Sequence, residues 1–380
     1  MSEPIRVVVV DHVARMSGAE IATLRLVQAL GDRVETHAVL GENGSLVDAL
    51  QQAGARVTVL PLPDEIRDLR RADTAGPGRR SALGATSNYA WHLARLLRRE
   101  RPDLVHTVSL KAALYGGLAG RLALRPVVWH VHDLVDETHL PGPTVRTVRR
   151  AARRLPRLVM ANSGATLAAL PGAPQGRVVP NPVPEPRFYA APAAGRMRTV
   201  GIVGRIAPWK GQDVFLRAFA EAFPPPSRTR AVLAGAALFG EEEFAARLDS
   251  LARALQIRDR VDFLGQVDDI DGVLADLDVL VHCSVLPEPF GQVIVEGMAA
   301  GVPVVAAAAG GPTEIVTDGL DGLLTSPGDV GDLAFALSRL DYDPALRRRL
   351  AEGGFRRAAH FAPERAARAV LHAYEDARSR

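Results

Sequence analysis

Cysteine is almost absent from this chain of 380 residues, which contains only Cys283. A single cysteine excludes an intrachain disulfide framework and suits a reducing compartment such as the cytoplasm. Cys283 follows an apolar strand-like run, and a small buried side chain is therefore a better interpretation than a catalytic nucleophile.

Long apolar runs are missing too. No stretch reaches the roughly eighteen consecutive apolar residues that a membrane-spanning helix needs. The short apolar run at residues 7–10 ends at Asp11, which is typical of a β-strand and not of a signal peptide. The sequence therefore predicts a soluble, cytoplasmic protein.

Lysine is scarce as well. Of 46 basic residues only Lys111 and Lys210 are lysines, and the formal net charge is +3. So small a net charge does not indicate general affinity for nucleic acid. Because arginine supplies nearly all positive charge here, each lysine indicates a position where a compact ammonium group is favoured.

What the chain has in abundance is an alternation of strand-like and helix-like segments. The alternation predicts an α/β fold with parallel sheets and helices on both faces. In the first half the expected strands are 5–10, 34–40, 56–60, 104–107 and 127–131, and the expected helices 19–30, 46–53, 90–100 and 112–122. A second series begins with a strand at 199–203.

Chain length and a proline-rich segment indicate two domains. A chain of 380 residues exceeds the size of most single domains, and residues 178–186 include four prolines. We predict a linker at this segment, between an N-terminal domain of residues 1–183 and a C-terminal domain of residues 190–360.

Residues 286–301 carry the most informative pattern. A strand-like run at 278–282 precedes them, and residues 292–300 are expected to form a helix that begins directly after Gly291. Ligands of such βαβ units bind at the carboxyl edge of the sheet, and a helix N-terminus binds anions.

Glu288 and Glu296 flank the start of this expected helix. Eight helical residues would separate them by about 12 Å, whereas the paired carboxylates of glycosidases lie about 5–9.5 Å apart. The spacing therefore disfavours an acid–base pair. Two interpretations stay open: the carboxylates hold different parts of one long ligand with an anionic middle, or both are solvated surface residues.

The Glu-x7-Glu pattern, followed by further similarity at residues 308–324, resembles the motif of retaining glycosyltransferases of family 4. The resemblance covers nearly the whole chain and is strongest over residues 201–324. It implies a GT-B fold, in which two Rossmann-like doubly wound domains face a central cleft and the last helix (364–380) crosses back to the first domain. It also implies that the second domain binds a nucleotide-sugar and the first mainly the acceptor.

For the second domain, the resemblance implies a role for each matched residue. Arg205 and Lys210, in a Gly-Arg-x4-Lys-Gly element, would bind the donor's diphosphate. Glu296 would bind ribose hydroxyls and Glu288 the sugar. The remaining expected donor contacts are Phe290, Gly291 and Gln292 at the helix start, and Gly265 and Val267, whose backbone would hold the base.

For the first domain, the resemblance singles out two positions. Gly18 would approach an anion at the start of the first helix, in a loop that resembles the family's Gly-Gly-Ala-Glu with Ser17 in place of the first glycine. His132, at a strand end, would reach a hydroxyl of the donor sugar from the opposite domain, with His130 as the second candidate.

The activity implied is retaining transfer of a sugar from a nucleoside-diphosphate-sugar, UDP- or GDP-linked, to a hydroxyl of a small-molecule or lipid-linked acceptor. No metal ion and no other cofactor is expected. Two alternatives stay open: a nucleotide-sugar 2-epimerase-like isomerase, whose acid–base residues do not map onto Glu288 and Glu296, and a non-catalytic nucleotide-sugar binder. An arginine- and alanine-rich composition suggests a bacterial source.

Two arginine-rich segments complete the sequence. Residues 67–86 have little periodicity and predict a mobile insertion. Residues 144–157 predict a helix with a basic flank, which is either a solvated face, a weak contact with anionic lipid at the inner membrane face, or a contact with a phosphate-bearing acceptor. The flank consists of Arg146, Arg149, Arg150, Arg153, Arg154 and Arg157.

Overall fold

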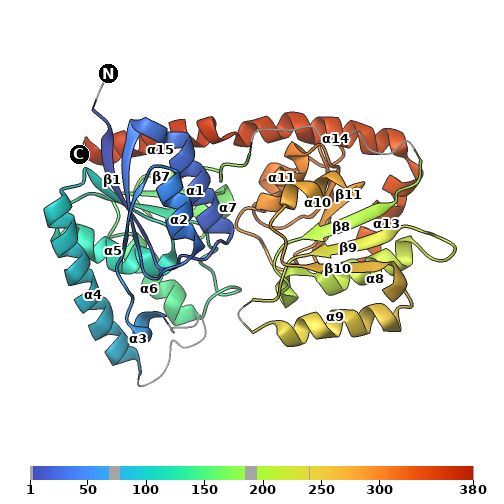
Figure 1. Cartoon of the computed structure of the whole chain (residues 1–380), viewed down its shortest axis with the longest axis horizontal. Helices are drawn as coiled ribbons and strands as arrows, with labels where there is room; N and C mark the ends of the chain where they lie inside the picture. Colours follow the sequence, from blue (N-terminus) through green and yellow to red (C-terminus); the bar gives the residue numbers. More distant parts are fainter. Residues whose placement is uncertain (1–2, 68–77, 185–194, 239, 380) are drawn as a thin grey trace. The chain divides into compact units, whose positions relative to one another are not determined.

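The computed structural model describes residues 3–67, 78–184, 195–238 and 240–379, and it contains two compact units (Figure 1). Unit 1 comprises residues 1–182 and 363–380, and unit 2 comprises residues 183–362. Each unit is built around one parallel β-sheet with helices on both faces.

The sheet of unit 1 has seven strands in the order β3-β2-β1-β4-β5-β6-β7, all parallel. The chain winds outward in one direction from β1 to β3 and in the other from β4 to β7, and the switch point therefore lies between β1 and β4. The strands are β1 (Ile5–Asp11), β2 (Val34–Leu40), β3 (Arg56–Val59), β4 (Leu104–Thr107), β5 (Val127–Val131), β6 (Leu158–Ala161) and β7 (Gly176–Val178).

Alternate residues of β1 point to opposite faces of this sheet. Val8 and Val10 pack with α4 (Gly78–Glu100), α5 (Leu110–Leu122) and α6 (Gly142–Ala152). Val7 and Val9 pack on the other face with α1 (Gly18–Leu30) and α15 (Pro363–Arg378), the red helix of Figure 1. The shorter helices are α2 (Ser45–Gln52), α3 (Asp64–Arg67) and α7 (Gly164–Ala168).

The sheet of unit 2 repeats this winding with six parallel strands in the order β10-β9-β8-β11-β12-β13. Its switch point lies between β8 and β11. The strands are β8 (Thr199–Val203), β9 (Arg230–Ala234), β10 (Val261–Gly265), β11 (Val279–His282), β12 (Val304–Ala307) and β13 (Leu323–Thr325).

Helices cover both faces of the second sheet as well. One core joins the sheet to α8 (Gln212–Ala222), α9 (Glu242–Ala254), α13 (Val330–Tyr342) and α14 (Pro344–Ala358). The other joins it to α10 (Ile270–Ala275) and α11 (Gln292–Ala299), and α12 (Pro312–Ile315) follows β12. In the part of the chain that the structure describes, no helix combines the length and apolarity needed to cross a membrane.

The predicted fold class, two Rossmann-like parallel-sheet domains, is confirmed. Two details are wrong. The expected insertion at 67–86 is helical from Gly78 onward, as the start of α4, and residues 68–77 lie outside the described ranges. The expected helix at 144–157 ends at Ala152, and Arg149 and Arg153 donate to the carbonyl oxygens of Ala169 and Pro171.

Candidate functional site

The switch point of unit 2 brings two loops together at the carboxyl edge of its sheet. The loop after β8 carries Arg205 and Lys210, and the loop after β11 carries Ser284 and Glu288. Because β8 and β11 are hydrogen-bonded neighbours, side chains almost eighty positions apart in the sequence meet here.

Lys210 and Glu288 form an ion pair between Nζ and Oε1. The same carboxylate oxygen accepts a hydrogen bond from Ser284 Oγ at 2.7 Å and lies 3.2 Å from His282 Nε2. Burial raises the pKa of Glu288, but Lys210 and His282 outweigh burial and lower the pKa overall. Glu288 is 6% exposed, and its interpretation as a solvated surface residue is therefore wrong.

The backbone of Glu288 is held as firmly as its side chain. Its N–H donates to Ala309 O at 3.2 Å, and its carbonyl accepts from Gly311 N–H at 2.8 Å. Gly310 lies directly alongside with φ +75°, and a Cβ there would stand 2.2 Å from Glu288 O. A glycine is therefore required at 310 to bring the two segments together.

The loop that carries Arg205 and Lys210 packs directly onto the end of β11. Gly211 has φ +74°, and a Cβ there would lie 2.1 Å from Cys283 O. The Cys283 thiol donates to Gly211 O at 3.0 Å, and burial raises its pKa to about 12. Cys283 is thus a buried neutral thiol, as the sequence suggested. In the same loop, Arg205 forms an ion pair with Glu241, and its Nη1 lies 3.7 Å from Glu241 Oε1.

Helix α11 begins beside this cluster, and Gly291 is its N-cap residue with φ +96°. Phe290 is buried and packs edge-on against Phe361, with ring centroids 5.8 Å apart. Its side chain is therefore part of the core, and only its backbone can serve a ligand. Glu296 is half-buried, and its Oε1 accepts from Gln292 Nε2 at 3.0 Å.

The two residues expected near a nucleotide base lie at the carboxyl end of β10. Gly265 ends that strand with φ +67° and is exposed, and its carbonyl accepts from Gly235 N–H. Val267 is partly buried against the same core as α11. The second-domain residues singled out by the sequence therefore all lie at the carboxyl edge of the sheet or on the first five residues of α11 and its N-cap.

In unit 1, three histidines stack at the ends of β4 and β5. His106 is buried and bonded to Tyr374 OH at 2.6 Å, and burial lowers its pKa to about 3, which indicates a structural role. The ring centroids of His130 and His132 lie 4.2 Å apart. His132 Nδ1 is 3.1 Å from Asn181 Oδ1, and burial lowers the pKa of its imidazole. Asn181 Oδ1 accepts the Nδ1 proton, which leaves a lone pair on Nε2.

Gly18 is the first residue of α1, and a Cβ there would meet no atom within 4 Å. Ser17 occupies the N-cap position but does not cap the helix, because its hydroxyl donates to the Glu20 carboxylate. The backbone at the start of α1 therefore remains open to a ligand at Gly18.

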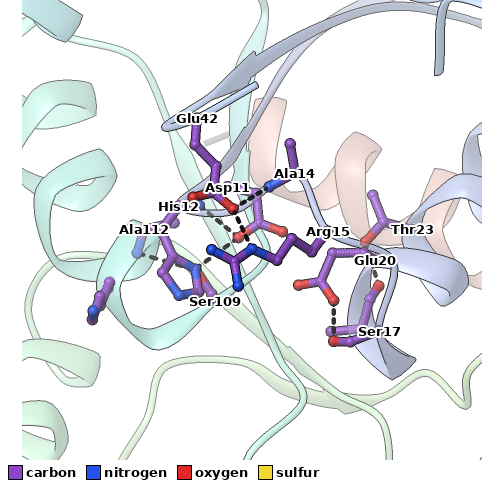
Figure 2. Close-up of polar contacts among 12 residues, drawn as sticks. Asp11, His12, Ala14, Arg15, Ser17, Glu20, Thr23, Glu42, Ser109 and Ala112 are labelled. Atoms are coloured by element: carbon purple, nitrogen blue, oxygen red, sulfur yellow. Dashed lines mark hydrogen bonds and ion pairs between the residues drawn. The ribbon is translucent and has the colours of Figure 1, made fainter. Parts of the chain in front are cut away.

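The sequence did not single out Asp11, His12 and Glu20 as site residues, yet they gather at the end of β1 (Figure 2). The position of Asp11, the first polar residue after an apolar strand, was an available signal. Glu20 also had a signal, because it is the glutamate of the loop that resembles Gly-Gly-Ala-Glu, although a carboxylate beside the apolar stripe of α1 is usually exposed.

Comparison with known proteins places this geometry in a family. The model of Glycosyltransferase Family 4 matches residues 16–187, and that of glycosyl transferases group 1 matches residues 190–357. The D-inositol 3-phosphate glycosyltransferase of Actinosynnema mirum is 35% identical over 310 residues, 73% of each chain. The chain belongs to glycosyltransferase family 4.

Solved structures of this family's architecture superpose on nearly the whole chain. Anabaena Alr3699/HepE, solved in complex with UDP-glucose, has a TM-score of 0.84 at 29% identity and covers 98% of this chain and 100% of its own. Sucrose-phosphate synthase from Thermosynechococcus elongatus has a TM-score of 0.78 at 22% identity, with 98% of both chains covered, and supports the fold alone. The enzyme is therefore a glycosyltransferase with the GT-B fold.

Proposed function

We propose that this glycosyltransferase moves a sugar from a UDP-sugar to a hydroxyl of an acceptor, with retention of anomeric configuration and without a metal ion. The observation that carries the proposal is the cluster of Lys210, Glu288 and the start of α11 at the switch point of unit 2. The complex of Alr3699/HepE with UDP-glucose favours UDP over GDP.

The departing diphosphate needs positive charge that is in place before the bond breaks. Arg205, Lys210 and the backbone N–H groups at the start of α11 supply it at one edge of the sheet. Glu296, further along α11, presents two carboxylate oxygens, which is what the two hydroxyls of a ribose require. Gly265 and Val267 would contact the base through their backbone.

Glu288 is poorly suited to be a covalent nucleophile. Its Oε1 is engaged by Lys210 and Ser284, and its lowered pKa reflects a strongly stabilised carboxylate. We assign it to holding the donor's sugar. Retention then follows from front-face displacement, in which the acceptor oxygen attacks the side from which the diphosphate leaves and the diphosphate takes the acceptor's proton.

Titration calorimetry with UDP, GDP and dTDP in buffer containing EDTA tests the donor assignment. UDP is expected to bind at least about tenfold more tightly than GDP, which corresponds to a difference of at least about 1.4 kcal/mol in binding free energy. A crystal soaked with UDP that places the diphosphate away from Arg205 and Gly291 would contradict the proposal, as would binding that requires a divalent metal.

We further propose that unit 1 binds the acceptor and that His132 Nε2 accepts a hydrogen bond from a substrate hydroxyl. Asn181→Ala is expected to lower kcat about tenfold and to change KM less than twofold, because the tautomer of His132 is no longer fixed. Asn181→Asp should restore kcat at neutral pH but move the acidic limb of the pH profile upward, since a carboxylate raises the pKa of the imidazole. Identical pH profiles for the two variants would exclude this role.

The exposed arginines on and after α6 are proposed to give weak contact with anionic lipid at the inner face of the membrane. Replacing Arg146, Arg150 and Arg154 by glutamine is expected to weaken binding to phosphatidylserine vesicles about 100-fold at low salt, since each basic residue near the surface contributes roughly 1 kcal/mol. The matched control replaces three exposed arginines of α14, Arg348, Arg349 and Arg356. An equal loss of vesicle binding in both triple variants would show that binding depends on the overall positive charge and not on this surface.

A further inference from the structure

The switch point of unit 1 holds a buried carboxylate with an oxygen that has no partner. Asp11 ends β1 and is 2% exposed. Its Oδ1 accepts from the backbone N–H of His12 at 2.7 Å and lies 3.2 Å from His12 Nδ1. Its Oδ2 is buried and makes no hydrogen bond within the described part of the chain.

A second buried carboxylate faces the first. Glu20, in the first turn of α1, is 3% exposed and accepts a hydrogen bond from Ser17 Oγ. Burial and the nearby charge of Asp11 raise its pKa to about 7. In Figure 2 the Glu20 carboxylate points toward Asp11 across the loop that joins β1 to α1. Arg15, in the loop between β1 and α1, is paired with Glu42, and its Nε lies 3.5 Å from Glu42 Oε1.

Two buried carboxylates at short range, one of them with an unpartnered oxygen, are unfavourable on their own. A buried carboxylate oxygen without a hydrogen-bond donor is rare, because its desolvation is not offset. It therefore marks the place where a ligand supplies the missing donor. An added anion would instead meet two carboxylates at short range, and like charges in a buried site repel strongly.

We propose that Asp11 and Glu20 bind an O–H or N–H group of the acceptor, and that they select a polyhydroxylated acceptor that is neutral or carries an amino group and reject one with a phosphate at this end. The inference rests on the proposed function, in which unit 1 binds the acceptor. It separates this enzyme from its Actinosynnema mirum relative, whose named acceptor is a phosphate ester.

Three probes that differ in one substituent test the inference: scyllo-inositol, scyllo-inosamine and scyllo-inositol monophosphate, titrated calorimetrically with UDP present. The amine is expected to bind at least about tenfold more tightly than the phosphate, with the neutral cyclitol between them. In Asp11→Asn the ratio of affinities for the amine and the phosphate should fall to about threefold or less. Glu20→Gln should lower this ratio as well.

The matched control is Asp103→Asn, which removes one negative charge from the residue directly before β4, at the opposite edge of the same sheet. It should leave the ratio unchanged. Equal or tighter binding of the phosphate by the wild-type enzyme would overturn the inference, as would no binding of any probe at about 50 mM or an unchanged ratio in both Asp11→Asn and Glu20→Gln. Failure of UDP itself to bind would instead count against the proposed function.

Discussion

Replacing Glu296 by alanine is expected to raise the Kd for UDP about 100-fold and to abolish measurable transfer. A hydrogen bond to a charged group contributes about 1.5–3 kcal/mol, and loss of two ribose hydroxyl contacts therefore removes about 3 kcal/mol, or two powers of ten in affinity. The fold should survive, because Glu296 is only half-buried in the middle of α11 and accepts a hydrogen bond from a side chain of the same helix, Gln292.

Titration calorimetry with UDP and a UDP-release assay measure the two effects. Glu243→Ala on α9 is the matched control, because its side chain is 88% exposed and forms an ion pair with Arg247, four residues later in the same helix. It should bind UDP as the wild type does. Near-wild-type turnover of Glu296→Ala would remove Glu296 from the site.

Much of the fold could be predicted because parallel strands buried on both faces are continuous apolar runs. Strands β2, β4, β5 and β8 have the expected bounds. The two errors have local causes. Gly78 to Thr86 lacks apolar periodicity and extends a helix whose later turns are packed through residues such as Leu93 and Leu97. Helix α6 ends at Ala152, and a short turn follows that leads into β6.

The candidate site was predictable as a set of residues but not as a set of contacts. The Glu-x7-Glu pattern indicated Glu288, and the scarcity of lysine indicated Lys210, but their ion pair depends on the pairing of β8 with β11. The Asp11–Glu20 pair was missed for the same kind of reason. It depends on how α1 turns back onto the end of β1, which periodicity along a single helix does not specify.

Removing either partner of the Lys210–Glu288 pair is expected to destabilise unit 2 by about 3 kcal/mol, because a buried charge is left without its partner. Lys210→Met leaves the Glu288 carboxylate buried, and Glu288→Gln leaves the ammonium beside His282. Urea unfolding, monitored by hydrogen exchange of peptides from β11 and α11, measures the loss in the free energy of unfolding of unit 2. Transfer activity should fall at least about 100-fold in both variants if the pair positions the donor.

The double variant Lys210→Met/Glu288→Gln separates pairing from packing. It should recover more than half of the lost stability while remaining inactive, because no charge is then left unpaired. The difference in free energy of unfolding between the wild type and the single variants should also depend on pH. The folded-state pKa of Glu288 lies below its ordinary 4.5, and the stabilisation is therefore fully present above that pH and lost on further acidification. Additive losses in the double variant, or a wild-type advantage that grows as pH falls below 4.5, would show that the pair does not stabilise unit 2 through its charges.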